Sequence, residues 1–308
     1  TRLWLLCQEL WRDGLRHLAE RLERCLRGQL HPPRLLLRGQ ELELRHALVM
    51  GILNVTPDSF SNGGRYLEPR RAVEHALWMA EQGADIVDVG GESSRPGAEP
   101  VPVEEELRRV IPVIEGIRAK SDVPISVDTY KAAVAREAIR AGADMVNDVS
   151  AGRFDPEMVE VVRSAGVPMV VMHMRGTPRT MQRDVRYRSL LGEVVGFLQE
   201  RVEHLEQRGV DPRAIVVDPG LGFGKSVERD NLVLLKHLGE LRALGKPILV
   251  GPSRKAFIGH VLGLPVEDRE EGTAAAVAVA VMNGANIVRV HDVRRMKRVV
   301  KVVEAIQR

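Results

Sequence analysis

Cysteine and aromatic residues are scarce in this chain of 308 residues. It has two cysteines, Cys7 and Cys25, and both lie near the N-terminus. Two cysteines in a chain of this length form neither a disulfide framework nor a zinc cluster, so a reducing, cytoplasmic environment is predicted. Aromatic residues make up 4% of the chain and hydrophobic residues 44%, so the core must consist mainly of Leu, Val, Ile and Ala.

The chain also lacks a long apolar run and a strong excess of charge of either sign. The apolar run at residues 3–7 is far too short to cross a membrane, and no signal-peptide cleavage site follows it. There are 45 Lys and Arg residues against 42 Asp and Glu residues, a net charge of +3. The basic residues are not interleaved with aromatic ones as in nucleic-acid-binding proteins. We expect neither a membrane nor a nucleic acid as partner, and small anionic substrates are favoured.

Short apolar runs alternate with helical patterns eight times from residue 47 onward. The expected strands are 48–54, 85–90, 124–128, 145–149, 168–173, 214–218, 247–251 and 287–291. The expected helices are 70–82, 103–119, 131–141, 155–165, 187–208, 229–243, 270–284 and 293–307. Eight right-handed βα units predict an α/β protein with the closed (β/α)8 architecture of a TIM barrel. An open doubly wound sheet is the alternative, which the regular count disfavours.

The residues before this repeat have patterns of their own. Four leucines at helical spacing predict an amphipathic helix that ends before Pro32 and Pro33; they are Leu15, Leu18, Leu22 and Leu26. Residues 34–46 alternate around Gly39, which predicts a short hairpin at the bottom of the barrel. We therefore divide the chain into an N-terminal helical extension, residues 1–34, and a barrel domain, residues 35–308.

Polar residues stand at the C-terminal ends of all eight predicted strands, where barrels carry their active sites. They are Asn54, Asp88, Asp128, Asn147, Asp148, His173, Asp218, Ser253, Arg254, Lys255, Arg289 and His291. A single buried Asp or His is usually a satisfied core group, but eight equivalent positions together indicate a site. For Asp88, Asp148 and His173 taken singly, structural support and ligand contact are equal alternatives.

The residue types indicate two kinds of ligand group. One set offers carboxylates, an amide and an ammonium group, which match a flat heterocycle rich in N–H, amino and carbonyl groups. That set consists of Asp128, Asn147, Asp218 and Lys255. A second set is rich in hydrogen-bond donors and suits a phosphate. It consists of Asn54, Arg95, Arg289 and His291. The side-chain oxygen of Asn54 can also bind Mg2+ that bridges to a pyrophosphate.

The motifs along the chain resemble those of the dihydropteroate synthase family, in that family's order. They read MGILNVTPDSFSNGG from Met50, DVGGESSRPGA from Asp88, SVDTYK from Ser126, NDVSAG from Asn147, VMHMRGTPRTMQ from Val171, DPGLGFGK from Asp218, LVGPSRK from Leu249 and VRVHDV from Val288. The resemblance implies condensation of 6-hydroxymethyl-7,8-dihydropterin pyrophosphate with p-aminobenzoate. The products are 7,8-dihydropteroate and pyrophosphate, in a step of folate synthesis that sulfonamides inhibit. The resemblance also implies a homodimer.

The resemblance further implies a role for each matching residue. The pterin would bind Asp128, Asn147, Met172, Asp218, Phe223 and Lys255. The pyrophosphate would bind Asn54, Arg95, Arg289 and His291, with Mg2+ as cofactor at Asn54. The p-aminobenzoate would bind Phe60, Ser94, Pro96 and Ser253. The catalytic residues would be Asp58, Asp128, Asp218, Lys255 and Arg289.

The family's mechanism is dissociative: pyrophosphate leaves first, and the aniline nitrogen then traps a cationic pterin-methylene group. Two residues depart from the family pattern. Ser94 replaces a threonine and keeps its hydroxyl, whereas Asn62 replaces an aspartate that is thought to stabilise the cation. Asp58 is the nearby carboxylate that can take over this role.

Two alternative functions remain open at this point. A pterin-binding methyltransferase barrel would pass a methyl group to a corrinoid, and it would share the fold and the pterin contacts. It would not need the SRPG loop or the two anion-binding motifs. A catalytically silent pterin-binding paralogue is the second alternative, and Asn62 is the feature that favours it.

Overall fold

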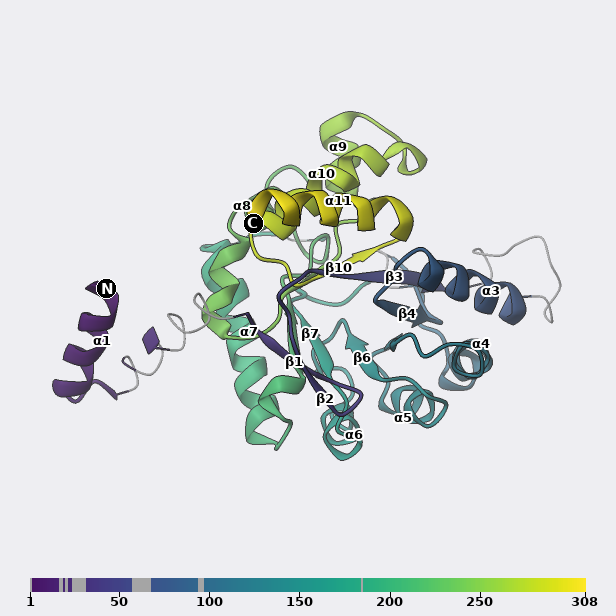
Figure 1. The fold of residues 1–308 in the computed structure, drawn as a ribbon, viewed down its shortest axis with the longest axis horizontal. Coiled ribbons are helices and arrows are strands. Elements are labelled where there is room, and N and C mark those ends of the chain that lie inside the picture. The colour runs from purple at the N-terminus through teal and green to yellow at the C-terminus, as the bar shows by residue number, and fades with distance from the viewer. Residues whose placement is uncertain are drawn as a thin grey trace.

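Eight parallel strands form a single curled sheet in the computed structural model, which describes residues 2–16, 19, 22–23, 32–56, 68–93, 97–183 and 185–308 (Figure 1). The strands are β3 (Leu48–Asn54), β4 (Ile86–Gly90), β5 (Ile125–Asp128), β6 (Met145–Asp148), β7 (Met169–Met172), β8 (Ile215–Asp218), β9 (Leu249–Val250) and β10 (Ile287–Val290). Their order is β8-β7-β6-β5-β4-β3-β10-β9. A parallel bridge from Val217 to Ile248 joins the two edges. The predicted barrel is confirmed, and the open sheet is excluded.

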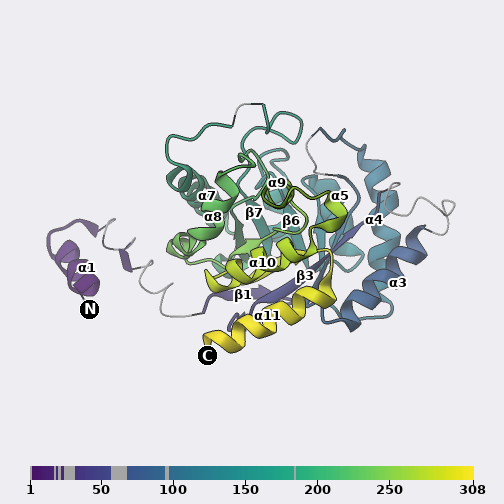
Figure 2. The same cartoon turned by 90° about the horizontal axis from the view of Figure 1, so that it is seen from above.

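Helices between the strands cover the outside of the barrel (Figures 1 and 2). They are α3 (Glu68–Glu81), α4 (Val103–Arg118), α5 (Ala132–Arg140), α6 (Met158–Ala165), α7 (Leu190–Gln207), α8 (Asp230–Lys236), α10 (Glu270–Met282) and α11 (Val293–Gln307). The expected helix 229–243 is divided at His237. The first part is α8, and the second is the 3-10 helix η3 (Leu238–Leu244), which contains Gly239. An unpredicted helix, α9 (Ala256–Leu262), follows β9 and ends at Gly263, whose φ is 67°.

The strand side chains divide between two apolar clusters. Alternate residues such as Val49, Val87 and Val146 pack outward against the helices. The inward-facing cluster has seven strand residues, Met50, Ile86, Met145, Val170, Val216, Leu249 and Ile287, and three from the N-terminal segment, Leu35, Leu37 and Leu44. Since most of the strand members lie at or near the start of their strands, the N-terminal end of the barrel is filled. The C-terminal end is left for polar groups.

The N-terminal hairpin closes the bottom of the barrel, as predicted. Its strands are β1 (Arg34–Leu37) and β2 (Gln40–Glu43). The turn residues Arg38 and Gly39 both have positive φ, 54° and 71°, as a tight two-residue hairpin turn requires. Leu35 and Leu37 face the barrel and are buried, whereas β2 is exposed.

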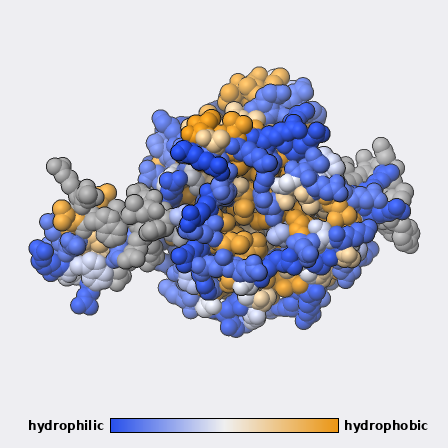
Figure 3. Space-filling view, viewed as in Figure 1, coloured by the Kyte–Doolittle hydropathy of each residue, from blue (hydrophilic) through white to orange (hydrophobic). Residues whose placement is uncertain are grey.

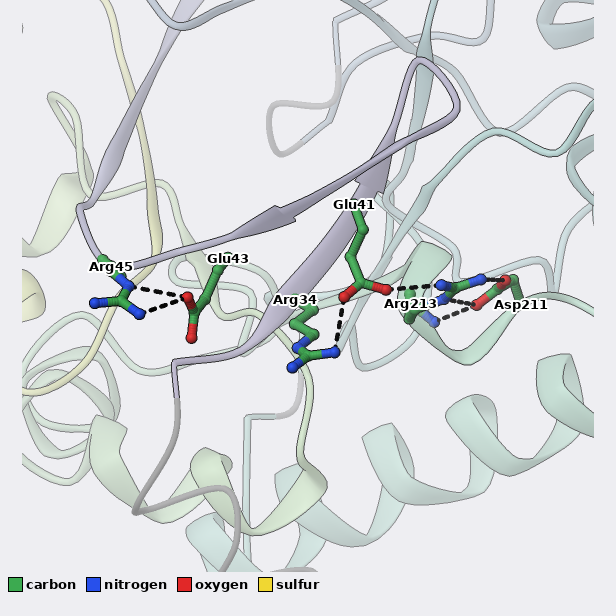
Figure 4. A network of polar contacts seen from close by, with 6 residues as sticks. All are labelled: Arg34, Glu41, Glu43, Arg45, Asp211 and Arg213. Carbon is green, nitrogen blue, oxygen red and sulfur yellow. Dashed lines mark hydrogen bonds and ion pairs between the residues drawn. The ribbon is translucent and has the colours of Figure 1, made fainter.

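Ion pairs tie the hairpin to the barrel (Figure 4). Glu41 accepts from Arg34 at 2.8 Å and from Arg213 at 2.7 Å, and Arg213 also pairs with Asp211 at 2.7 Å. Asp211 and Arg213 lie at the 3-10 turn η2 (Pro212–Ala214), directly before β8. Exposed pairs contribute little free energy, so the buried leucines supply most of the hairpin's attachment.

A helix that the leucine spacing does not predict, α1 (Arg2–Arg12), lies at the N-terminus and ends in a turn in which Gly14 has a φ of 76°. The leucine-spaced segment follows this turn. Its described residues 16, 19, 22 and 23 are helical, and Leu18 and Leu26 lie outside the described residues. Figures 1 and 2 both show α1 apart from the barrel. In the described ranges, no helix is long and apolar enough to cross a membrane. The domain boundary at residue 34 stays a prediction.

The leucines of the hairpin provide a test of the barrel plug. We expect Leu35→Ala to lower the free energy of unfolding by about 2–4 kcal/mol, because it leaves a cavity under the barrel. Urea denaturation measures this. Leu42→Ala is the matched control, since Leu42 is on β2 and 36% exposed, and it should cost less than about 1 kcal/mol. Equal losses in the two variants would contradict a plugging role.

Candidate active site

Arg289 on β10 lies at the centre of a polar cluster at the C-terminal end of the barrel. Its Nε donates to Asp88 Oδ2 at 2.6 Å, and its Nη2 donates to Asp128 Oδ2 at 2.7 Å. Asn147 Nδ2 also donates to Asp88 Oδ2, at 3.0 Å. The sequence placed Arg289 in the phosphate set, but its guanidinium here contacts the heterocycle set. The two predicted sets therefore meet at this residue.

Asp88 supports this cluster from below. It is fully buried, and its Oδ1 has no hydrogen-bond partner among the described residues. Asp88 thus orients Arg289 and Asn147 and is not itself exposed to a ligand. Asp148 has a similar supporting role, since its carboxylate accepts from the backbone N–H groups of Ser150 at 2.7 Å and Gly152 at 2.8 Å.

Burial shapes the protonation of the two carboxylates at the mouth. Burial raises the pKa of Asp218 to about 6, although a bond from the Gly220 N–H and the nearby Lys255 and Lys225 charges oppose the rise. Burial also raises the pKa of Asp128, against the opposing charge of Arg289. Both carboxyl groups are therefore easier to protonate than in water, and a hydrogen-bond donor or a cation would favour their charged form.

Lys225 shapes the loop that follows β8, and sequence reasoning missed its role. Its fully buried Nζ contacts the carbonyl oxygens of Gly220 at 3.0 Å, Phe223 at 2.9 Å and His173 at 3.2 Å, and the Nδ1 of His173 at 2.8 Å. Burial, with the Lys225 charge, lowers the pKa of His173 to about 3. The ring stays neutral, so His173 supports the loop. The available clue was a lysine at the end of a glycine-rich segment with no phosphate-binding pattern.

The loop held by Lys225 places Phe223 in the site. The Lys255 Nζ lies 4.4 Å from the centroid of the Phe223 ring. Phe223 and Met172 belong to one small buried cluster, with Val149, Met174 and Met181. Gly220 has a φ of 69°, and a Cβ there would come within 2.0 Å of the His173 carbonyl oxygen, so only glycine fits. The predicted ring-packing residues are thus brought together beside Asp218 and Lys255.

The remaining predicted residues surround this centre. Asn54 ends β3 beside Gly90 of β4 and is half-buried. Ser253 and His291 contact each other, with 2.9 Å between Ser253 Oγ and His291 Nδ1. The predictions for Asp58, Phe60, Asn62, Ser94, Arg95 and Pro96 lie outside the described residues.

A second buried network, also missed from the sequence, lies beside the motif that contains Ser94. Lys131 Nζ contacts the carboxylates of Glu92 and Glu106 and donates to the Val101 carbonyl oxygen at 2.6 Å. Glu92 also accepts from the Tyr130 hydroxyl at 2.6 Å and from the Val101 N–H at 2.9 Å. These bonds fix both flanks of the segment between residues 92 and 101.

The part of the chain that the structure describes has no cluster of side chains that would bind a metal tightly. No group of three or more His, Cys, Asp and Glu residues there could hold one. Asn54 by itself nevertheless fits Mg2+, because this ion keeps several waters and commonly takes one or two protein oxygens together with substrate phosphates.

The model of the pterin binding enzyme family matches residues 50–291 of this chain. The chain belongs to this family. A dihydropteroate synthase of Synechocystis sp. is 48% identical over 265 residues, which cover 86% of this chain and 91% of the relative. The solved structure of Xanthomonas albilineans dihydropteroate synthase with 4-aminobenzoic acid is 48% identical, with a TM-score of 0.83, and covers 90% of this chain and 98% of that one.

The Xanthomonas albilineans enzyme in complex with 7,8-dihydropteroate is 46% identical, with a TM-score of 0.80. That match covers 89% of this chain and 99% of the Xanthomonas chain. The resemblance of the motifs to dihydropteroate synthases is confirmed by these matches. This pterin-binding family member is an enzyme of that group.

The buried lysine provides a test of the loop. We expect Lys225→Met to lower the free energy of unfolding by at least about 3 kcal/mol, because three buried carbonyl oxygens lose their donor. Lys236→Met on the exposed side of α8 is the control and should change it by less than about 0.5 kcal/mol. Denaturant unfolding of both variants checks this. A Lys225→Met protein as stable as the wild type would show that the loop needs no central donor.

Proposed function

We propose that this chain condenses 6-hydroxymethyl-7,8-dihydropterin pyrophosphate with p-aminobenzoate, giving 7,8-dihydropteroate and pyrophosphate. The observation that carries the proposal is the Arg289 cluster. One guanidinium contacts Asp88 and Asp128 at the mouth of a barrel that also presents Asn147, Asp218 and Lys255. Carboxylates for a heterocycle and a cation for a phosphate are thus combined in one site.

The pterin ring finds complementary groups at this mouth. Its amino and ring N–H groups are donors that suit the carboxylates of Asp218 and Asp128, and its carbonyl and ring nitrogens are acceptors that suit Lys255 and the Asn147 amide. Met172 and Phe223 form a buried apolar surface on which the flat ring can pack.

The pyrophosphate group belongs on the other side of Arg289. Asn54, His291 and Arg95 are assigned there together with Arg289, and guanidinium groups bind phosphate oxygens through paired, charge-assisted bonds. Mg2+ held by Asn54 and the pyrophosphate oxygens would neutralise charge on the leaving group. p-Aminobenzoate is assigned to Phe60, Ser94, Pro96 and Ser253.

The proposed reaction depends on electrostatic stabilisation of its transition state more than on a general base. When the bond to the pyrophosphate breaks, negative charge grows on the leaving group and positive charge on the pterin-methylene. In this proposal, Arg289 stabilises the negative charge on the leaving group. The carboxylates of Asp128 and Asp218 stabilise the positive charge on the pterin-methylene. Fixed charges aimed at developing charges are an effective form of catalysis in a buried site. Lys255 holds the ring, and Asp58 is assigned to the cation from the first loop.

We also propose that the chain forms a homodimer through its late helices. Exposed apolar residues gather there: Val279 and Met282 on α10, and Val302 and Ile306 on α11. Figure 3 shows a further hydrophobic surface around α9, which projects at the top of the view. Monomeric proteins rarely leave such patches open. The cytoplasmic location expected from the cysteine content stays a prediction.

Pyrophosphate release that depends on p-aminobenzoate tests the proposal directly. We expect Arg289→Ala and Asp218→Ala each to lower kcat by about 100-fold or more, because each removes a charge that faces the reacting centre. Arg140→Ala, on the exposed face of α5, is the control and should keep normal turnover. Near-normal turnover of a folded Arg289→Ala or Asp218→Ala protein would remove that residue from the mechanism.

The same assay separates the alternative functions. Pterin binding without pyrophosphate release would support a silent paralogue, and methyl transfer to a corrinoid would support a methyltransferase. The full reaction excludes both.

The affinity for the dihydropterin should fall at acidic pH. Because burial holds the pKa of Asp218 at about 6, protonation below that value removes the acceptor that the pterin needs. We expect the dissociation constant to rise at least tenfold per pH unit below pH 6, and Asp128, whose pKa burial also raises, adds to this rise. Calorimetric titration from pH 5 to pH 8 measures this. Asp218→Asn should bind weakly with a shallower dependence on pH; an unchanged profile would assign the titration to another group.

A further inference from the structure

A cavity of about 350 Å³ lies between α6 and α7. It is lined by residues of the segment after β6, the start of α6 and the second half of α7. Its charged lining residues are Arg153, Glu160, Arg201, His204 and Arg208. None of these belongs to the predicted site. The volume is at the small end of the range for small-molecule sites.

The lining of the cavity carries an excess of positive charge. Its single carboxylate, on Glu160, is engaged by Arg163 at 2.6 Å and by the Ser164 hydroxyl at 2.7 Å. Among the described residues, no carboxylate forms an ion pair with Arg153, Arg201 or Arg208. These three guanidinium groups therefore dominate the lining.

The hydrogen bonds of the arginines are to backbone groups. Arg201 Nε donates to the Ala151 carbonyl oxygen at 2.9 Å. Arg153 donates to the carbonyl oxygens of Ser150 at 2.9 Å and Met174 at 3.1 Å, and its guanidinium stacks 5.0 Å from the Phe197 ring centroid. Such contacts fix the positions of the guanidinium groups without neutralising them.

The cations also act on one another. Burial lowers the pKa of His204, and the charges of Arg201 and Arg208 lower it further, against the opposing charge of Glu200. The charge of Arg201 likewise adds to burial in lowering the pKa of Arg153, and the charges of Asp148 and Glu200 oppose this. Like charges gathered at one cavity destabilise each other, and an anion bound between them would relieve the repulsion.

We propose that this cavity binds a small anion that carries phosphate or carboxylate groups. Arginine is the side chain best suited to planar, bidentate contact with either group. The site would hold its ligand on Arg201 and Arg208 of α7 and on Arg153, with His204 as an additional donor.

The site is joined to the barrel mouth by one short segment. Arg201 and Arg153 hold the carbonyl oxygens of Ala151 and Ser150, and the N–H groups of Ser150 and Gly152 bind Asp148. Asn147, which contacts Asp88 in the candidate active site, directly precedes this segment. An anion in the cavity would therefore contact arginines that hold the segment next to Asn147.

Titration calorimetry with inorganic phosphate and with citrate, at constant ionic strength and without substrates, tests the proposal. We expect at least one probe to bind the wild-type protein with a dissociation constant below about 1 mM. Tighter binding of phosphate would assign the site to phosphate esters, and tighter binding of citrate to polycarboxylates. Absence of measurable binding by both would overturn the proposal.

Charge-matched variants locate the bound anion. Arg201→Gln combined with Arg208→Gln should weaken binding at least tenfold. The control combines Arg140→Gln on α5 with Arg71→Gln on α3, which removes the same charge from exposed positions and should leave binding within twofold. Arg208→Gln alone, which removes no side-chain hydrogen bond among the described residues, should weaken binding at least threefold without loss of Tm. Equal binding by all variants would place the anion elsewhere, including at Arg289.

Discussion

The contact between the Arg289 guanidinium and the carboxylates of Asp88 and Asp128 is the interaction on which the barrel mouth depends. It joins β10 to β4 and β5, which are not neighbours of β10 in the sheet. Burying charges costs several kcal/mol per ion, and the cost is offset only while the partners stay together. The cluster is thus a fixed arrangement in which the loss of one member leaves the others unpaired. It positions Asn147 and the reacting charges before a ligand arrives.

The N-terminal end of the barrel stabilises the fold, and the C-terminal end carries the candidate active site. At the N-terminal end, Leu35 and Leu37 complete an inner apolar layer that contains no charged side chain. At the other end, the pKa values of Asp128, Asp218 and Arg289 are shifted, and Asp88 has an unsatisfied oxygen among the described residues. Buried charges of this kind have an unfavourable electrostatic energy, which a ligand of complementary charge lowers.

Local patterns predicted the fold well, and long-range contacts explain the rest. Every strand predicted in the eightfold repeat overlaps an observed one, because a short apolar run is a local feature. The division of the helix at His237 depends on a single turn that periodicity does not resolve. Sequence reasoning found the residues at the strand ends, but not that Arg289 contacts Asp88, 201 residues away. Lys225 was missed likewise, since its partner His173 is 52 residues distant.

The closure between β8 and β9 gives the barrel one weak side. β9 has only two residues, and the sheet is joined there by a single isolated bridge, whereas β3 and β4 pair along five residues. Few backbone hydrogen bonds cross this seam. The seam separates the loop of Asp218 from the segment of Ser253 and Lys255. A flat ring bound to both Asp218 and Lys255 would therefore bridge the two edges of the sheet and add contacts where the barrel has fewest of its own.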